Sequence, residues 1–331
     1  MKSVQESVRC SLITGASGFV GRRLCAALQA RRTRVRALAR HVRSGPWDEF
    51  AAVDLAVARL QPGALADVDT VFHLAARTHA LADTEADAAR YRRLNVEATR
   101  GLLDVAVHDG VRRFIFLSSV KALGEGSAER LDESSPEQPV TAYGRSKLEA
   151  ERLVHAAGQA HGLHTVVLRL PLVYGPGVKG NLRRMLEAVE RGRFPPLPEC
   201  GNRRSLVHVD DVVAAARLVS QSAAAAGRTY IVTDGLTYST RGILDLMGRA
   251  CGRQPARWSI PLAALRGAAA LGSAAGALLG RRLAFDRAAL DKLIGSACYD
   301  SARIEQELGF QPRHTLEGAL AEMVAELRET Q

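Results

Sequence analysis

Aromatic residues are scarce in this chain of 331 residues, at 5% of the total, and its five cysteines are scattered without a CxxC pair. The shortage of rings, with arginines spread along the chain, argues against a nucleic-acid surface, which stacks bases on aromatic side chains. The cysteine spacing suits neither a disulfide framework nor a zinc site, and no His/Cys/Asp cluster has metal-ligand spacing. We therefore expect no nucleic-acid partner and no metal.

A long uninterrupted apolar run is also missing. The first residues lack the apolar core of a secretory signal, and the most apolar stretch, 262–279, is interrupted by Arg266 and rich in alanine and glycine. It falls short of the ~20 apolar residues of a spanning helix, which favours a docking helix. We expect a reduced, cytoplasmic protein without membrane insertion.

The composition is that of an ordinary globular protein. Hydrophobic residues make up 47% and charged residues 24%, which excludes disorder, collagen and coiled coil. Lysine and arginine number 45 against 35 acidic residues, for a net charge of +10. That excess predicts anionic partners: nucleic acid, a membrane surface or phosphate-bearing small molecules.

Short apolar runs alternate with helical patterns through the first half of the chain. This alternation predicts βαβ units and an α/β fold, a doubly wound parallel sheet of the Rossmann type. The regularity fades beyond Pro171, which indicates a smaller, discontinuous C-terminal substrate domain. The predicted strands are 11–14, 34–39, 70–74, 114–117, 165–170 and 229–232, and the predicted helices include 18–30, 86–107 and 146–155. The predicted domains are 1–171 with 206–232 for the cofactor, and 172–205 with 233–331 for the substrate.

A glycine-rich turn separates the first predicted strand from the first helix. Its sequence, TGASGFVG at 14–21, has GxxGxxG spacing. Glycines here permit a tight turn and close backbone approach to a pyrophosphate, and the helix N-terminus supplies free N–H groups. Glycines also mark ordinary loops, but the position between strand and helix favours a dinucleotide site.

The end of the second predicted strand bears on the choice of cofactor. Dinucleotide folds usually place an acidic residue there for the ribose 2′-hydroxyl, whereas this chain has Arg40 and Arg43 and no carboxylate. Two arginines suit a 2′-phosphate, so NADP is slightly favoured over NAD; the alternative is that both are simply solvated. Asp54 either accepts a hydrogen bond from the adenine amino group or is a surface residue.

A tyrosine and a lysine lie four residues apart, in YGRSK at 143–147. On a helix they share one face. An adjacent ammonium favours the phenolate and lowers the phenol pKa from its usual value near 10, which suits proton transfer. The YxxxK spacing alone is common, but here it follows Ser118 and Ser119 at the end of the fourth predicted strand.

Together these segments resemble the extended short-chain dehydrogenase/reductases, the NAD-dependent epimerase/dehydratase family. Residues 118–126 and 177–186 carry a narrower resemblance, to the UDP-glucose 4-epimerase-like subgroup that includes UDP-N-acetylquinovosamine dehydrogenase, a UDP-4-keto-6-deoxy-sugar reductase. The motifs, in order, are TGASGFVG at 14–21, HLAA at 73–76, NV at 95–96, LSSV at 117–120, YGRSK at 143–147, PLVYGPG at 171–177, RSLVHVDDV at 204–212 and ARIEQELGF at 302–310.

The resemblance implies a role for each matched residue. Ser119 would hydrogen-bond the sugar oxygen at C4, Tyr143 would exchange its proton, and Lys147 would lower the tyrosine pKa and bind the nicotinamide ribose. Asn95 either supports the site or only fills the packing there. The implied cofactor-binding residues are Gly15, Ser17, Gly18, Phe19, Val20, Arg40, Arg43, Asp54, Leu55, Leu74, Ala75, Ala76, Asn95, Tyr143, Lys147 and Pro171. The implied substrate-binding residues are Lys121, Asn181, Leu182 and Arg204.

Some positions depart from the family pattern. The 4,6-dehydratases have an Asp–Glu pair after the catalytic threonine, where this chain has Val120 and Lys121, so a dehydratase is not expected. Lys121 either contacts a substrate oxygen or lies on the loop surface. Leu172 replaces a usual asparagine, which puts one diphosphate contact in doubt. We interpret His73 and His208 as structural.

The expected activity is hydride transfer at C4 of a UDP-hexose, by a 4-keto-6-deoxy-sugar reductase or a 4-epimerase of bacterial surface-polysaccharide precursor synthesis. One alternative is a steroid- or flavonoid-type ketoreductase, which would not need Arg204 or Asn181. Another is a non-catalytic NADP-binding sensor, which would not need the serine, tyrosine and lysine. The resemblance also implies a homodimer through the helices 86–107 and 146–155.

Overall fold

The computed structural model describes residues 10–41, 44–77, 85–279, 283 and 285–330. The strands are β1 (Cys10–Thr14), β2 (Arg34–Ala39), β3 (Glu49–Ala52), β4 (Val68–His73), β5 (Arg113–Ser119), β6 (His164–Leu170), β7 (Leu172–Tyr174), β8 (Arg204–His208), β9 (Arg228–Ile231) and β10 (Thr237–Tyr238). The α-helices are α1 (Phe19–Gln29), α2 (Glu85–Tyr91), α3 (Ala98–His108), α4 (Ala142–His161), α5 (Asn181–Glu190), α6 (Val209–Gln221), α7 (Thr240–Ala250), α8 (Leu262–Leu278), α9 (Arg287–Ile294), α10 (Ala302–Leu308) and α11 (Leu316–Glu329). A π-helical segment, η1 (Arg92–Glu97), joins α2 to α3, and the short 3₁₀ turns η2 (Val120–Ala122) and η3 (Ala223–Ala225) follow β5 and α6.

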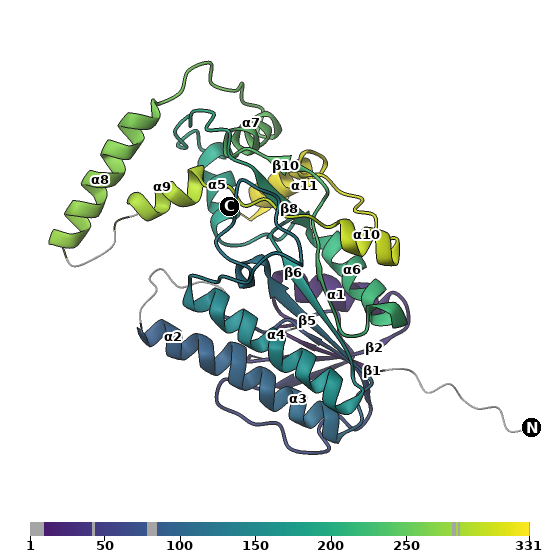
Figure 1. The fold of residues 1–331 in the computed structure, drawn as a ribbon. Coiled ribbons are helices and arrows are strands. Elements are labelled where there is room, and N and C mark those ends of the chain that lie inside the picture. The colour runs from purple at the N-terminus through teal and green to yellow at the C-terminus, as the bar shows by residue number, and fades with distance from the viewer. Residues whose placement is uncertain (1–9, 42–43, 78–84, 280–282, 284, 331) are drawn as a thin grey trace, which may run out of the picture.

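Seven strands form one parallel sheet in the order β3-β2-β1-β4-β5-β6-β9 (Figure 1). Successive side chains of a strand point to opposite faces, so both faces of a strand can be buried only between two layers of helices. Phe114 and Phe116 of β5 pack with α3 and α4, whereas Ile115 and Leu117 pack with α1 and α6. The predicted α/β, doubly wound Rossmann class is confirmed.

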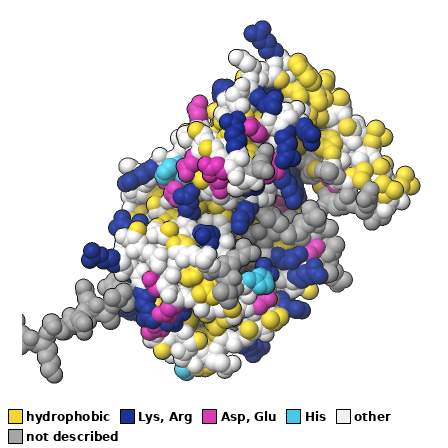
Figure 2. All heavy atoms as spheres, turned by 180° about the vertical axis from the view of Figure 1, so that it is seen from behind, with side chains coloured by type: hydrophobic (Ala, Val, Ile, Leu, Met, Phe, Trp, Pro, Cys, Tyr) yellow, Lys and Arg dark blue, Asp and Glu magenta, His cyan; other side chains and the backbone are white. Residues whose placement is uncertain are grey.

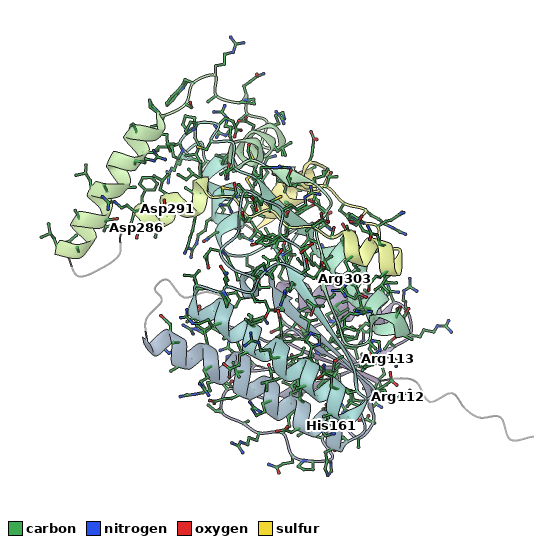
Figure 3. All side chains as sticks on the ribbon, in the orientation of Figure 1. Arg112, Arg113, His161, Asp286, Asp291 and Arg303 are labelled. Atoms are coloured by element: carbon green, nitrogen blue, oxygen red, sulfur yellow. The ribbon has the colours of Figure 1, made fainter. Side chains whose placement is uncertain are left out.

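The strand order reverses between β1 and β4, which places a crevice at the carboxyl ends of these strands. At the opposite edge, ion pairs join neighbouring strands. Arg112 and Arg113, at the start of β5, bind the Asp69 carboxylate of β4 (Figure 3). Thr14, His73 and Ser119 end their strands at the edge of the sheet where the crevice lies.

The C-terminal portion has its own core. The three-stranded sheet β10-β8-β7 packs with α5, α7, α8, α9 and α11 around residues such as Leu182, Leu206 and Met247. α10 belongs elsewhere, because Ile304 and Phe310 pack into the core under the large sheet. The portion is thus folded from separate stretches of the chain, while the predicted domain boundaries stay a prediction.

The helix predicted over 146–155 is about twice as long in the structure. Its start is set by Thr141, whose hydroxyl accepts a hydrogen bond from the Gly144 N–H at 3.1 Å. Its end is set by Gly162, which adopts the left-handed conformation with φ 66°. Periodicity alone missed both capping residues. Within the described ranges, no helix has the length and hydropathy needed to cross a membrane.

Candidate active site

The glycine turn lies at the switch point of the large sheet. Gly15 has φ +70°, and a Cβ built on it would lie 2.9 Å from the backbone nitrogen of Ala75. A Cβ on Gly21 would lie 2.3 Å from the Gly15 carbonyl oxygen, so the helix can approach the turn only without that side chain. Gly18 begins α1 with no side chain capping the first N–H groups. The turn therefore presents uncapped N–H groups beside a backbone that leaves room for a phosphate.

Thr14 ties the turn to the neighbouring strand. Its hydroxyl oxygen accepts hydrogen bonds from the N–H groups of Leu74 and Ala75, at 3.1 and 3.0 Å. With both acceptor positions used, its proton is donated to Nδ1 of His73, 2.7 Å away. The loop after β4 is thereby fixed against the end of β1.

His73 extends this network into the helical layer. Since Nδ1 accepts, Nε2 carries the proton and donates to the Thr99 hydroxyl at 2.9 Å. Thr99 in turn donates to the carbonyl oxygen of Asn95 at 2.8 Å. Burial, with a smaller contribution from Lys147, lowers the pKa of His73 to about 3, so the ring is neutral. This agrees with the structural interpretation of His73.

Asn95 lies in the π-helical segment, and its carboxamide is fully hydrogen-bonded. The side-chain oxygen accepts from the Arg77 N–H at 2.8 Å. The side-chain nitrogen donates to the Arg77 carbonyl at 3.2 Å and to the Ser146 hydroxyl at 3.0 Å. Ser146 then donates to the carbonyl oxygen of Tyr143 at 2.7 Å. Asn95 therefore couples the loop after β4 to the first turn of α4, which favours its role as a support of the site.

The structure brings Ser119, Tyr143 and Lys147 together at the end of β5. The Tyr143 and Ser119 hydroxyls are hydrogen-bonded, and burial raises the pKa of Tyr143 to about 12 despite this bond. Lys147 is 2% exposed and its Nζ donates to the Leu117 carbonyl at 2.8 Å. Burial lowers the pKa of Lys147 to about 7. The sequence predicted that Lys147 would lower the pKa of Tyr143, and the structure does not bear this out. Burial has the larger effect on the phenol, and Nζ of Lys147 donates to the Leu117 carbonyl instead.

Ser118 is occupied by a different partner. Its hydroxyl donates to the Glu151 carboxylate, which also binds Nη2 of Arg169 at 2.6 Å. Arg169 and Glu151 are 3% and 2% exposed, so this is a buried ion pair between β6 and α4. The preference for Ser119 over Ser118 is consistent with this geometry, because only Ser119 is left facing Tyr143.

The C-terminal portion presents two buried donors without partners. Arg204 at the start of β8 donates from Nη2 to the Lys292 carbonyl, but its Nε has no partner among the described residues. The hydroxyl of Tyr299, a residue 3% exposed, is also unpaired there. The two groups are neighbours: burial lowers the pKa of Arg204, and the nearby Tyr299 opposes that shift. Buried donors are nearly always satisfied. Nε of Arg77 and of Arg217 are also buried and unpaired among the described residues, and what distinguishes Arg204 and Tyr299 is that two such donors are neighbours, which makes them candidates for contact with a ligand.

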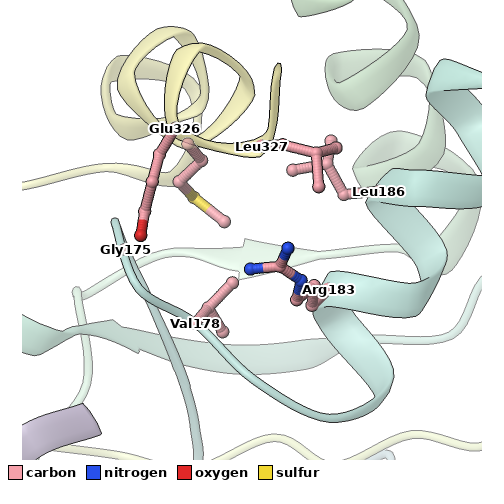
Figure 4. Close-up of a pocket in the computed structure, with 7 residues that line it drawn as sticks. Gly175, Val178, Arg183, Leu186, Glu326 and Leu327 are labelled. Carbon is pink, nitrogen blue, oxygen red and sulfur yellow. The ribbon is translucent and has the colours of Figure 1, made fainter. Parts of the chain in front are cut away.

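The other predicted substrate residues are dispersed. Nζ of Lys121 lies 2.6 Å from a Glu125 carboxylate oxygen in an exposed pair, which favours the surface interpretation. Asn181 is exposed at the start of α5, whereas Leu182 is buried in the C-terminal core. A cavity between α5 and α11 has about 10 Å³ of free volume, space for one water (Figure 4). Arg183 lines it and none of the catalytic candidates does.

His208, Asp210 and His314 form a cluster whose ligand atoms all lie within 4.8 Å of one another. The two rings are stacked with centroids 4.2 Å apart, and a ring lone pair lies in the ring plane, so stacked rings cannot both aim at one ion. His208 Nδ1 instead accepts from the Asp210 N–H at 3.2 Å and caps α6. The structural interpretation of His208 is consistent with these contacts.

Known proteins resemble this chain over most of its length. The model of the NAD dependent epimerase/dehydratase family matches residues 11–233. The chain belongs to the NAD dependent epimerase/dehydratase family. A UDP-glucose 4-epimerase of Vibrio cholerae is 31% identical, covering 92% of this chain and 92% of the relative. A 4-hydroxy-2-methyl-3-oxo-4-farnesyl-3,4-dihydroquinoline-1-oxide ketoreductase of Stigmatella aurantiaca is 30% identical, covering 79% of each. The solved structure of MoeE5 in complex with UDP-glucose and NAD superposes with a TM-score of 0.75 at 26% identity, covering 97% of this chain and 99% of that one.

Family membership, predicted from the motifs, is confirmed, and the turn described above fits a dinucleotide. Arg40 is exposed after β2, and no described residue binds its guanidinium; Arg43 lies outside the described residues. The Asp54 carboxylate accepts the Ala56 N–H at 3.0 Å and keeps further lone pairs, while Leu55 packs on the core. The remaining predicted cofactor residues lie at the same sheet edge: Ser17, Gly18, Phe19 and Val20 after β1, Leu74, Ala75 and Ala76 after β4, Tyr143 and Lys147 on α4, and Pro171 after β6.

Sequence reasoning missed Tyr299 and the hydrogen-bonded series that runs from Thr14 to Ser146. Tyr299 is carried by an irregular segment that forms an isolated bridge with Leu131. Neither a motif nor a periodic pattern marks such a residue. The only available signal was its place just before the ARIEQELGF motif of the family.

Proposed function

We propose that this family member transfers hydride at C4 of a UDP-hexose, as a 4-epimerase or a 4-keto-6-deoxy-sugar reductase. The observation that carries the proposal is the grouping of Ser119, Tyr143 and Lys147 beside the glycine turn. The UDP-glucose bound in the similar solved structure and the name of the Vibrio relative support the substrate class.

When bound, a nicotinamide dinucleotide supplies or accepts the hydride. Tyr143 exchanges a proton with the oxygen on C4, and Ser119 hydrogen-bonds that oxygen. Because burial holds the pKa of Tyr143 near 12, the phenol is protonated at neutral pH and ready to act as an acid. In the reduction of a C4 ketone, the oxygen on C4 would receive this proton.

The substrate diphosphate would satisfy the unpaired donors Arg204 Nε and Tyr299 OH. A guanidinium suits phosphate oxygens in geometry and charge, and a buried phenol adds one directed hydrogen bond. The exposed Asn181 at the start of α5 is proposed to bind the nucleotide. Lys121, paired with Glu125, is the weakest member of the proposed substrate set.

We propose NADP as the slightly preferred cofactor. Arg36 of β2 is engaged with Glu49 and Asp67, whereas Arg40 at the end of that strand is free of such partners among the described residues. A free guanidinium at this position suits a 2′-phosphate. The NAD of the similar solved structure supports NAD as the alternative.

The decisive experiment separates reductase from epimerase. Purified protein is incubated with NADPH and UDP-4-keto-6-deoxy-GlcNAc, and separately with UDP-GlcNAc and with UDP-glucose. Stoichiometric NADPH loss identifies a reductase, and inverted sugar without net cofactor change identifies an epimerase. Failure of all three sugars despite cofactor binding contradicts the proposal.

A ketoreductase of apolar substrates is the second candidate. The Stigmatella relative carries that name, and Leu172 is 44% exposed where sugar-nucleotide enzymes usually have asparagine. Such an enzyme would tolerate loss of Arg204. Retained turnover of a steroid or prenylated ketone by an Arg204→Met variant would favour it.

We further propose a cytoplasmic homodimer serving surface-polysaccharide precursor synthesis. The helices α3 and α4 lie side by side on one face of the large sheet, where a second copy could add its own pair (Figure 1). Light scattering after gel filtration measures the mass, and a monomer at micromolar concentration contradicts this arrangement.

A further inference from the structure

Helix α8 extends beyond α9 at the edge of the molecule (Figure 1), and nine of its 17 residues are exposed. One face is closely packed: Leu265, Ala269 and Gly276 are buried. A Cβ on Gly272 would lie 2.0 Å from the Phe285 carbonyl oxygen, so the segment before α9 touches the helix backbone. Within the described residues, only this side of α8 is packed against the rest of the protein.

The face next to this buried stripe, about 100° around the helix, is apolar as well. Ala264, Ala268, Leu271 and Leu278 recur at intervals of three, four and seven residues, and all are exposed. Leu271 is 74% exposed and Leu278 89%, and Leu279 just after the helix is 61% exposed. Hydrophobic side chains gather on this projecting lobe in the view from behind (Figure 2).

Such a face is unusual for a helix in water. A surface helix normally carries charged residues opposite its buried stripe, but α8 contains one charged residue, Arg266, and no acidic one. A contiguous exposed apolar patch usually marks a surface that another apolar phase covers.

Positive charge is dense in the sequence before and after this helix. Between positions 249 and 292 the sequence has eight lysines and arginines against two aspartates, which is +6 of the whole chain's net charge of +10. One of the aspartates, Asp286, is buried and caps α9 by accepting the Ala289 N–H at 2.8 Å (Figure 3). Trp258, 65% exposed, stands four residues before the helix.

We propose that the exposed face of α8 docks onto an anionic lipid surface. Leucines enter the boundary between headgroups and acyl chains, Trp258 lies at headgroup level, and Arg266 of the helix with other described basic side chains of positions 249–292 meets lipid phosphates. A second copy of the chain is a poorer occupant, because pairing two such faces would bring two segments of net charge +6 together. The helix lies in the interface plane, which is compatible with the finding that no described helix spans a membrane.

The test is flotation of the full chain with vesicles. Wild type is expected to float with vesicles that contain phosphatidylglycerol, to release in high salt, and to stay unbound with pure phosphatidylcholine. The triple substitution Leu271→Ser, Leu278→Ser and Leu279→Ser should reduce the bound fraction by at least about tenfold. The matched control is Val57→Ser, which removes another apolar side chain, 75% exposed, at a distant site and should bind like wild type.

Two readouts keep the proposal independent of the proposed enzyme function. Circular dichroism should show the triple variant folded, and its turnover of a water-soluble sugar nucleotide should match that of wild type. Absence of wild-type binding to anionic vesicles overturns the proposal. The proposal is also overturned if wild type forms an oligomer and the triple variant is a monomer, since a second copy of the chain would then cover the face.

Discussion

The two halves of the candidate site differ in how completely their buried polar groups are satisfied. At the sheet edge, Thr14, His73, Thr99 and Asn95 use their side chains in one continuous set of hydrogen bonds, and Nε of Arg77 is the buried atom of the neighbouring loop that lacks a partner among the described residues. Across the site, in the C-terminal portion, Arg204 Nε and Tyr299 OH have no partner among the described residues. The comparison indicates that the cofactor side is built in advance, whereas the substrate side awaits a ligand that supplies acceptors.

The largest expected effect comes from the residue between the two halves. Tyr143→Phe should lower kcat by about a thousandfold, because general acid–base groups contribute on the order of 10²–10⁴ in rate. Binding of the dinucleotide should change little, and both quantities are measured by steady-state kinetics and fluorescence titration. Tyr230→Phe is the matched control, since Tyr230 binds Glu307 away from the site. Retained turnover in the Tyr143 variant would end the assignment.

The unpaired arginine should act on substrate binding. Arg204→Met should raise KM for a UDP-sugar by about 10- to 100-fold with a smaller change in kcat, since hydrogen bonds to charged groups contribute roughly 1.5–3 kcal/mol. Arg203→Met, an exposed neighbour, serves as the control. An equal effect of both substitutions would show that general positive charge, rather than the buried donor, is responsible.

The free energy of unfolding should depend more on the hydrogen-bonded cofactor side than on the unpaired substrate side. Asn95→Ala removes three hydrogen bonds and leaves buried partners unpaired, so the free energy of unfolding should fall by about 3 kcal/mol. Tyr299→Phe removes a hydroxyl with no partner and should cost less than about 0.5 kcal/mol. Urea unfolding without ligand measures both; similar losses would contradict the comparison.

Acid should lower the free energy of unfolding through His73, which lies in the hydrogen-bonded cofactor side. Burial lowers its pKa from 6.5 to about 3, so between these values the unfolded chain binds a proton that the folded chain does not. Stability is therefore lost as pH falls from 6.5 toward 3, at up to about 1.4 kcal/mol per pH unit for one proton. In His73→Gln the slope over pH 4–6 should be smaller by up to that amount. An unchanged slope would contradict a neutral buried His73.

The smallest effect concerns cofactor choice. Arg40→Ala should weaken NADPH binding by about tenfold or less, as expected for one exposed charge, and leave NADH binding unchanged. Fluorescence titration with each nucleotide measures the ratio. Equal weakening for both nucleotides would mean that Arg40 does not read the 2′-phosphate.

The sequence predicted what is local and periodic. Each of the six predicted strands, the glycine turn and the spacing of Tyr143 and Lys147 lies within a few residues, so the residue pattern and turn chemistry are enough to predict them. Lys147 was expected to lower the phenol pKa, but the opposing effect of burial depends on the whole layer of α4 and β5. Thr14 with His73, and His73 with Thr99, are 59 and 26 residues apart, and only the folded sheet brings them together.

The C-terminal portion was less predictable for the same reason. Its core is assembled from separate stretches, and Tyr299 lies on an irregular segment that no pattern identifies. The helix predicted over 262–279 is present as α8, but only the structure shows that its outer face stays exposed.

The central claim is chemistry at C4 of a UDP-sugar with the proton carried by Tyr143. Proton NMR at C4, followed for wild type and Tyr143→Phe with nicotinamide cofactor and UDP-sugars, tests it most directly. The account predicts inversion at C4 or reduction of a C4 ketone in wild type and neither in the variant. Reaction at another carbon, or equal reaction in the variant, would contradict it.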